Sequence, residues 1–146
     1  MHAQILGPVI ALVGWSLVMW VWLYARRIPA MRAAKIDVGK LTGGTGKDLK
    51  QVIPAKSQWP ADNYNHLMEQ PTIFYAICLT LALMGQGDNL NVGIAWAYVI
   101  LRITHSIVQA TVNRIAVRFA LFTLATIPLV MLTVHAAIAF WRASFH

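Results

Sequence analysis

The sequence predicts an all-α integral membrane protein, a four-helix bundle that forms one domain over residues 1–146. Hydrophobic residues make up 58% of the chain and charged residues 12%, about half the usual share of charge in a globular protein. Several charge-free runs approach or exceed the roughly 20 residues that a helix needs to cross a bilayer. The lipid bilayer is therefore the expected partner. In this setting the net charge of +7 is interpreted as a topology signal, and no nucleic-acid partner is predicted.

The first predicted span covers residues 5–25 and is closed by Arg26 and Arg27. The connection that follows, residues 26–58, holds eight of the twelve basic residues and only two acidic ones. Its glycine-rich run at 43–46 lacks the spacing of a phosphate-binding loop, so nucleotide binding is not predicted there. We interpret the connection as a solvated loop.

The second predicted span, residues 61–85, begins with a polar cluster that runs directly into a long apolar stretch. At 100° per residue, one helix face collects Asp62, Asn65, His66 and Glu69. Pro71 has no N–H to donate to the carbonyl of Leu67, so a kink is expected there. A carboxylate at the entrance of a membrane span is expected to be paired or functional.

The third predicted span covers residues 92–113, and the fourth covers residues 119–141. Arg114 and Arg118 bracket the connection between them. The strongly polar groups of the third span share one face, and they are Tyr98, Arg102, His105, Ser106, Gln109 and Asn113. This pattern predicts a polar face that meets the polar cluster of the second span.

Four spans place both termini on the same side of the membrane. The connections 26–58 and 114–118 hold ten basic residues, whereas the opposite side offers only Arg142. The positive-inside rule then predicts that both connections are cytoplasmic and that both termini are non-cytoplasmic. A bacterial inner membrane is the expected location.

This topology predicts depths within the membrane. At 1.5 Å per residue, Glu69 and His105 lie about 12 Å from the cytoplasmic entrance, and Arg102 lies about 16 Å from it. Opposite charges at this depth are expected to pair, so we predict a Glu69–Arg102 ion pair with His105 beside it. Such a pair could equally be structural and only hold two helices together.

Further polar groups are expected to form a hydrated funnel that faces the cytoplasm. Its members are Asp62, Asn65, His66, Gln109, Asn113, Arg114 and Arg118. Their surplus positive charge would suit an anionic polar ligand from the cytoplasm, with a lipophilic small molecule arriving from the bilayer. No metal site is predicted.

These motifs resemble the MAPEG family, the membrane-associated proteins of eicosanoid and glutathione metabolism, in its bacterial type. The resemblance rests on Asn65-x-x-x-Glu69-x-Pro71 followed by Phe74-Tyr75, on Arg102-x-x-His105-Ser106, and on Asn113-Arg114-x-x-x-Arg118. It covers essentially the whole chain. It implies a homotrimer of four-helix subunits with glutathione bound between neighbouring subunits, near the cytoplasmic face.

The resemblance also implies roles for single residues. Arg118, or as second choice Arg114, matches the arginine that stabilises the glutathione thiolate. The candidate glutathione-binding residues are Asn65, His66, Glu69, Arg102, His105, Gln109 and Asn113. Three features depart from the best-known members. Asp62 stands near an expected arginine, Asn65 lies four instead of three residues ahead of Glu69, with His66 in the usual asparagine position, and Gln109 replaces a usual tyrosine.

The expected function is that of a membrane-embedded glutathione transferase or peroxidase acting on a lipophilic substrate. Two alternatives remain open: a non-catalytic lipid-binding member of the family, and an accessory subunit of a larger membrane complex.

Overall fold

The computed structural model describes residues 3–46 and 48–145, and within them every regular element is a helix. The elements are α1 (Leu6–Ala33), η1 (Val38–Lys40), η2 (Asp48–Gln51), α2 (Ala55–Leu67), α3 (Gln70–Leu83), α4 (Leu90–Thr111) and α5 (Ile115–Phe145). The predicted all-α class is therefore confirmed.

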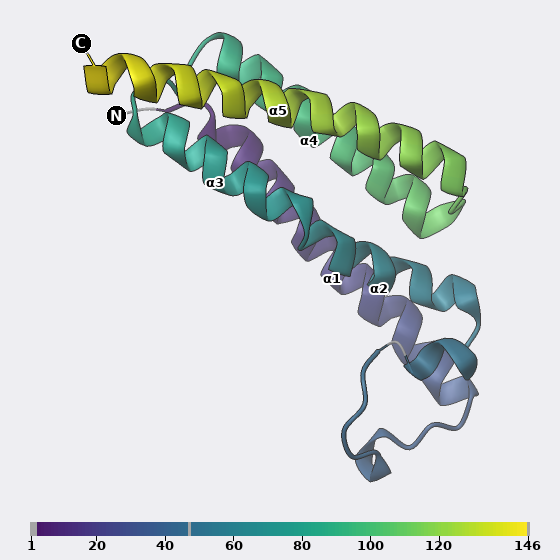
Figure 1. Cartoon of the computed structure of the whole chain (residues 1–146). Helices are drawn as coiled ribbons and strands as arrows, with labels where there is room; N and C mark the ends of the chain where they lie inside the picture. Colours follow the sequence, from purple (N-terminus) through teal and green to yellow (C-terminus); the bar gives the residue numbers. More distant parts are fainter. Residues whose placement is uncertain (1–2, 47, 146) are drawn as a thin grey trace.

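The helices lie as two elongated pairs. In Figure 1, α2 and α3 follow one another along α1 as a single broken rod, and α4 and α5 lie side by side as the second pair. The start of α1 and the end of α5 lie at the same end of the bundle, and the connection between α1 and α2 lies at the opposite end.

Three of the described helices are long and apolar enough to cross a membrane, namely α1, α4 and α5. Many of their large apolar side chains face outward; Ile10, Ile100 and Phe119, for example, are 60–70% exposed. Outward apolar side chains are expected where a helix contacts lipid. The chain is an integral membrane protein. α2 and α3, with 13 and 14 residues, are each shorter than the roughly 20 residues that a span requires.

The apolar core lies between the first part of α1, α3, the first half of α4 and α5. Its fully buried members include Leu12, Met19, Phe74, Cys78, Leu81, Tyr98, Val99 and Leu132. Phe74 and Tyr98 stack with ring centroids 4.3 Å apart and an interplanar angle of 17°. This stack joins α3 to α4 immediately beside the polar residues described below.

The second predicted span differs from the structure in one respect that shapes the site. α2 ends at Leu67 and α3 starts at Gln70, so the expected kink is a complete break. Glu69 lies outside both helices, with φ −90° and ψ −100°. Pro71 occupies the first turn of α3, where the missing N–H removes no helix hydrogen bond.

Four helix boundaries at the membrane surface lie well beyond the predicted spans, whereas α4, at Leu90–Thr111, lies within two residues of its predicted span. α1 continues to Ala33 rather than ending near residue 25, and α2 begins at Ala55 rather than at residue 61. α5 likewise extends past the predicted 119–141 at both ends. The reason is that helices continue past the apolar stretch into the polar surroundings, which hydropathy alone does not register.

The connection between α1 and α2 is mostly exposed, as predicted, but it is also fastened to the helices. Gln58 of α2 accepts a hydrogen bond from Arg27 Nη2 at 2.8 Å and donates one to the carbonyl of Gly46 at 3.3 Å. A Cβ on Gly46 would lie 2.9 Å from Arg27 Nη2, so a larger residue here would displace the guanidinium.

Candidate functional site

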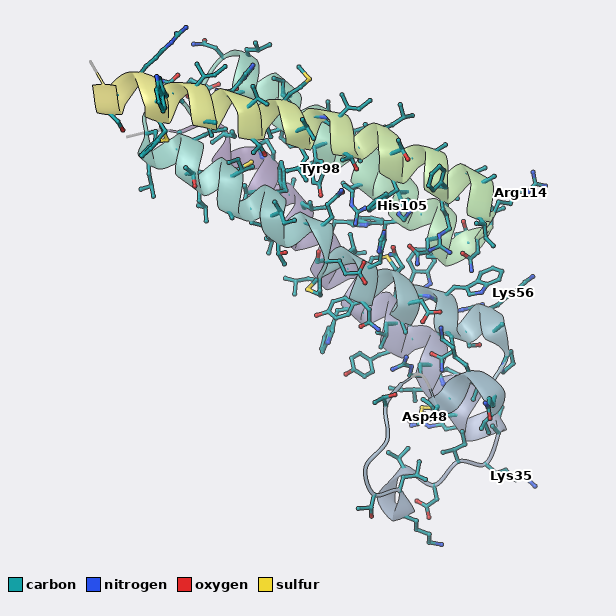
Figure 2. The ribbon with its side chains drawn as sticks, viewed as in Figure 1. Lys35, Asp48, Lys56, Tyr98, His105 and Arg114 are labelled. Carbon is teal, nitrogen blue, oxygen red and sulfur yellow. The ribbon has the colours of Figure 1, made fainter. Side chains whose placement is uncertain are left out.

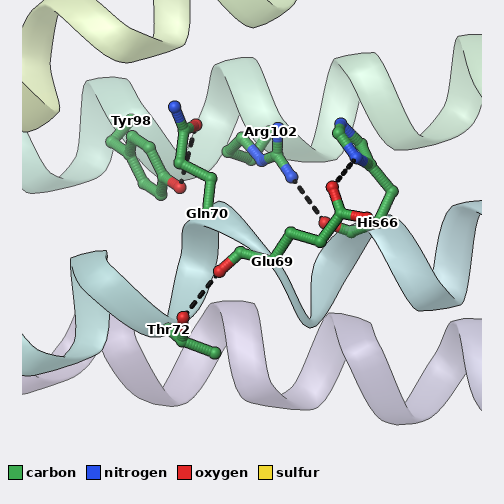
Figure 3. A network of polar contacts seen from close by, with 6 residues as sticks. All are labelled: His66, Glu69, Gln70, Thr72, Tyr98 and Arg102. Carbon is green, nitrogen blue, oxygen red and sulfur yellow. Dashed lines mark hydrogen bonds and ion pairs between the residues drawn. The ribbon is translucent and has the colours of Figure 1, made fainter.

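The break between α2 and α3 releases backbone groups inside the bundle. In a continuous helix, the carbonyl of His66 would accept the N–H of residue 70. In the structure it instead accepts a hydrogen bond from Arg102 Nη2 of α4 at 3.2 Å (Figure 3). Arg102 is completely buried, so this carbonyl is part of the polar environment that its guanidinium receives in place of water.

The predicted ion pair between Glu69 and Arg102 is wrong. None of the ion pairs among the described residues joins these two side chains. The carboxylate of Glu69 instead lies 2.8 Å from His66 Nδ1, and its side chain is 67% exposed. The cause is the helix break, because the non-helical backbone of Glu69 directs its side chain back along α2 instead of across to α4 (Figure 3).

The rings of His66 in α2 and His105 in α4 lie next to each other, with centroids 5.1 Å apart and planes tilted by 41°. Phe122 of α5 closes the group, 5.5 Å from the His66 ring and 6.4 Å from the His105 ring. The Arg102 guanidinium carbon lies 5.6 Å from the centre of the same phenyl ring, within the range of a cation–π contact. Sequence analysis missed Phe122, because one phenylalanine within an apolar span does not indicate which residues surround it.

These residues border a hollow that we call the histidine cavity. It has a volume of about 380 Å³ and is lined by His66, His105, Ile115, Arg118, Phe119 and Phe122. The volume lies within the range of small-molecule sites, and the lining combines apolar walls with a few polar groups, as such sites do. Three elements therefore build the cavity: the end of α2, the second half of α4 and the first turns of α5.

Arg118 is held in place by the turn between α4 and α5. Its Nη1 donates to Asn113 Oδ1 at 2.7 Å, and Asn113 adopts the left-handed backbone conformation, with φ +55°. The Nε of Arg118 is buried and has no hydrogen-bond partner among the described residues. Arg114, by contrast, is exposed, and Figure 2 shows it at the outer edge of this turn. The structure therefore separates the two candidate arginines.

A buried polar group lies behind the cavity and joins three helices. Ser106 of α4 accepts hydrogen bonds from Asn63 Nδ2 of α2 at 2.5 Å and from Trp15 Nε1 of α1 at 2.8 Å. Sequence analysis did not identify Asn63 or Trp15, because neither shares a helix face with the charged residues. The group fixes α4 against α1 and α2, and so fixes the position of the neighbouring His105.

The remaining predicted site residues lie elsewhere. Asn65 and Asp62 line a second hollow of about 190 Å³ next to Arg27. Asp62 forms an ion pair with Lys50 at 3.0 Å. Gln109 is buried, its Oε1 has no partner among the described residues, and it does not line the histidine cavity.

The charges around the histidine cavity favour an anion. Arg118 lines it, Arg102 lies behind the two imidazoles, and the nearest carboxylate, Glu69, is bonded to His66 at the edge. Two guanidinium groups near a partly apolar hollow can stabilise a negative charge that forms on a bound ligand. The arrangement thus suits an anionic ligand whose nucleophilic group lies next to a second, apolar ligand.

Comparison with known proteins supports the resemblance drawn from the motifs. The model of the MAPEG family matches residues 5–138, nearly the whole chain. No curated protein and no solved structure matched the chain. Together with the helical membrane architecture, the family match shows that the chain belongs to the MAPEG family, whose members are membrane proteins of eicosanoid and glutathione metabolism.

Proposed function

We propose that this protein is a glutathione-dependent transferase or peroxidase that acts on a lipophilic substrate. One observation carries the proposal: Arg118, oriented by Asn113 at 2.7 Å, lines a cavity together with His66 and His105. Family membership makes glutathione the first ligand to consider, and an oriented guanidinium is what a thiolate requires.

The charges of the site support glutathione as the ligand. Glutathione carries two carboxylates, and the cations nearest the histidine cavity are Arg102 and Arg118. Two carboxylates could repel this ligand: Glu69, which lies 2.8 Å from His66 Nδ1 at the edge of the cavity, and Asp62. Asp62 is paired with Lys50 at 3.0 Å and lines a different hollow, so its charge is compensated away from the cavity.

The chemistry follows from the thiol. A free thiol has a pKa near 8.5, so at neutral pH only a few per cent is in the nucleophilic thiolate form. The Arg118 guanidinium would lower the pKa of the bound thiol by stabilising the thiolate. In conjugation, the sulfur forms a bond to an electrophilic carbon and the leaving group departs with the bonding electrons. Ile115, Phe119 and Phe122 provide an apolar wall for that lipophilic substrate.

We further propose that α2 and α3 together form one membrane span, which gives four spans with both termini on the non-cytoplasmic side. The exposed Glu69 carboxylate then supports assembly as a homotrimer. A carboxylate about 12 Å inside a bilayer is costly unless polar groups surround it, and a neighbouring subunit can supply them.

Arg118→Ala in the full-length protein tests the proposal, and Arg114→Ala is the matched control. Wild-type protein mixed with glutathione at neutral pH should show thiolate absorbance at about 240 nm and should conjugate glutathione to an electrophilic aromatic chloride. Arg118→Ala should lose both signals at neutral pH and regain part of them at alkaline pH, because the thiol pKa returns toward about 8.5. Arg114→Ala should behave as wild type, because its side chain is exposed and outside the cavity.

Two results would contradict the proposal. Absence of thiolate absorbance in wild-type protein would remove the enzyme function. An Arg118→Ala variant as active as wild type, with an inactive Arg114→Ala, would assign the thiolate to Arg114. Melting temperature should change little in either variant, because partly or fully exposed charges contribute little to stability.

A non-catalytic lipid-binding member of the family is the second candidate. It is favoured by the position of Asn65 and Gln109, which do not line the histidine cavity and so leave three polar side chains for glutathione. If the protein is instead an accessory subunit of a membrane complex, we likewise expect neither thiolate absorbance nor conjugation. The thiolate measurement distinguishes both from the enzyme.

A further inference from the structure

A second large hollow lies at the opposite end of the bundle, where the chain begins and α5 ends (Figure 1). We call it the terminal pocket. Its volume is about 690 Å³, and its walls come from the turn between α3 and α4 and from the last turns of α5. The residues with polar side chains that line it are Gln86, Asp88, Asn89, Asn91, His135 and Arg142. The proposed glutathione site uses none of them.

The terminal pocket holds one anionic and one cationic side chain that do not pair with each other. Asp88 and Arg142 both line it, yet no ion pair joins them in the described part of the chain. Within the described residues, Asp88 Oδ1 accepts the backbone N–H of Gln4, at 3.2 Å. A carboxylate and a guanidinium that face the same hollow unpaired can receive the two charges of a zwitterion.

The third polar group of the pocket has a defined orientation. The amide of Asn91 donates from Nδ2 to the carbonyl of Gln86 at 2.8 Å, which directs its Oδ1 toward His135 Nδ1, 2.7 Å away. Because that oxygen can only accept, His135 carries its proton on Nδ1 in the neutral form. Its Nε2 is therefore an acceptor, suited to an N–H donor in the pocket.

Apolar groups adjoin these polar ones. Leu90, Ile138 and Ala139 line the same hollow, and Trp141, which is 63% exposed, stands next to Arg142 in the sequence. Exposed tryptophans concentrate where the headgroups of a bilayer meet its acyl chains. Since α5 is one of the helices apolar enough to span a membrane, its last turns lie at that level.

We propose that the terminal pocket binds a phospholipid that carries a primary ammonium, such as phosphatidylethanolamine. Arg142 binds the phosphate through charge-assisted hydrogen bonds. Asp88 and His135 Nε2 accept hydrogen bonds from the ammonium group. The acyl chains lie along the outward apolar side chains of α5, among them Val134 and Ile138.

This chemistry predicts which headgroups are rejected. A choline headgroup has the same charges, but its quaternary nitrogen has no N–H to donate to Asp88 or His135. A glycerol headgroup lacks the cation and would leave the Asp88 carboxylate beside a net anionic lipid. The preference should therefore be for ethanolamine over both choline and glycerol.

The test uses the full-length protein in nanodiscs made from equal parts of phosphatidylethanolamine, phosphatidylcholine and phosphatidylglycerol. After extraction into mild detergent, native mass spectrometry counts the lipids that stay bound to the protein. Wild-type protein should retain more phosphatidylethanolamine than either of the other two lipids. Asp88→Asn should show a smaller preference for the ethanolamine lipid over the choline lipid than wild type, because the carboxylate charge is lost while His135 remains, whereas Arg142→Gln should retain less of all three.

Two control variants carry the same changes at the other end of the bundle, Asp37→Asn and Arg32→Gln, and both should keep the wild-type preference. Asp37 and Arg32 are exposed, and neither lines the terminal pocket. Neither Asp88 nor Arg142 forms an ion pair in the described chain, and the asparagine keeps the oxygen that accepts the Gln4 N–H, so both variants should fold.

Three results would overturn the proposal. Equal retention of the three lipids by wild-type protein would show that the pocket does not discriminate between their headgroups. A preference for phosphatidylglycerol would show that Arg142 acts alone. Displacement of the bound lipid by an equal concentration of water-soluble phosphoethanolamine would assign the pocket to a soluble metabolite.

Discussion

The two halves of α4 are buried to the same degree but meet different partners. In the first half the buried residues are Ile94, Ala95, Tyr98 and Val99, and in the second they are Arg102, His105, Ser106, Gln109 and Ala110. The first half contacts the apolar core around Phe74 of α3. The second half contacts the polar end of α2, where Asn63 and the carbonyl of His66 bind it.

The difference shows that burial alone does not separate a core from a site in this protein. What separates them is the break between α2 and α3, which lies at the level where α4 changes from apolar to polar. On one side of the break the partner helix offers phenyl and alkyl groups. On the other side it offers an amide that bonds Ser106, an imidazole, and the carbonyl of His66, which accepts a hydrogen bond from the buried guanidinium of Arg102.

The largest effect is expected in the apolar half. Phe74→Ala removes a fully buried ring that stacks on Tyr98 at 4.3 Å, and it leaves a cavity between α3 and α4. The free energy of unfolding should fall by about 3–5 kcal/mol, measured by denaturant titration in mixed micelles. The control is Ile73→Ala on the outward side of the same helix, where the side chain is 58% exposed. Equal losses in the two variants would mean that the stack does not exist.

Replacing Ser106 tests the polar half. Ser106→Ala removes the acceptor of both Asn63 Nδ2 and Trp15 Nε1, and it leaves two buried donors without a partner. We expect a loss of about 1–2 kcal/mol in the free energy of unfolding, since hydrogen bonds between membrane helices contribute little each. Activity should fall as well, because His105 loses its fixed neighbour.

The matched control for Ser106→Ala is Thr104→Val on the same helix. Thr104 is exposed, and its hydroxyl donates to the carbonyl of Ile100 in its own helix, at 2.8 Å. Thr104→Val should leave both stability and activity near wild type. If Thr104→Val instead lost as much stability and activity as Ser106→Ala, the losses in Ser106→Ala could not be assigned to its hydrogen bonds with Asn63 and Trp15.

Much of the fold was predictable from the sequence, because charge-free runs of membrane length and their basic flanks are strong signals. The break in the second span was only partly predictable. Pro71 indicated a kink, but a proline can be absorbed in a bent helix as well as in a full break. Which one occurs depends on whether another group satisfies the released carbonyls, and that group, Arg102, is remote in sequence.

The candidate site was predicted unevenly for the same reason. Helical periodicity placed Arg102, His105 and Ser106 on one face, and the structure shows all three buried there. Periodicity failed for Glu69, because the face argument assumes a helix that continues through it. It also missed Phe122, since one phenylalanine in an apolar span carries no signal of its neighbours.

The smallest effect is expected at the boundary between the two halves. The Tyr98 hydroxyl donates to Gln70 Oε1 at 3.4 Å, a long and therefore weak hydrogen bond. Gln70 keeps a second and shorter bond, from Nε2 to Thr126 Oγ1 at 2.9 Å, so it stays anchored when the hydroxyl is removed. Tyr98→Phe preserves the stack on Phe74 and should change the free energy of unfolding by at most about 0.5 kcal/mol.

The measurement is denaturant titration of Tyr98→Phe and of Tyr98→Leu, which removes the ring and should lower the free energy of unfolding several times more. A Tyr98→Phe variant as unstable as Tyr98→Leu would show that the hydroxyl, rather than the ring, holds this position, and the polar half of α4 would then begin one turn earlier.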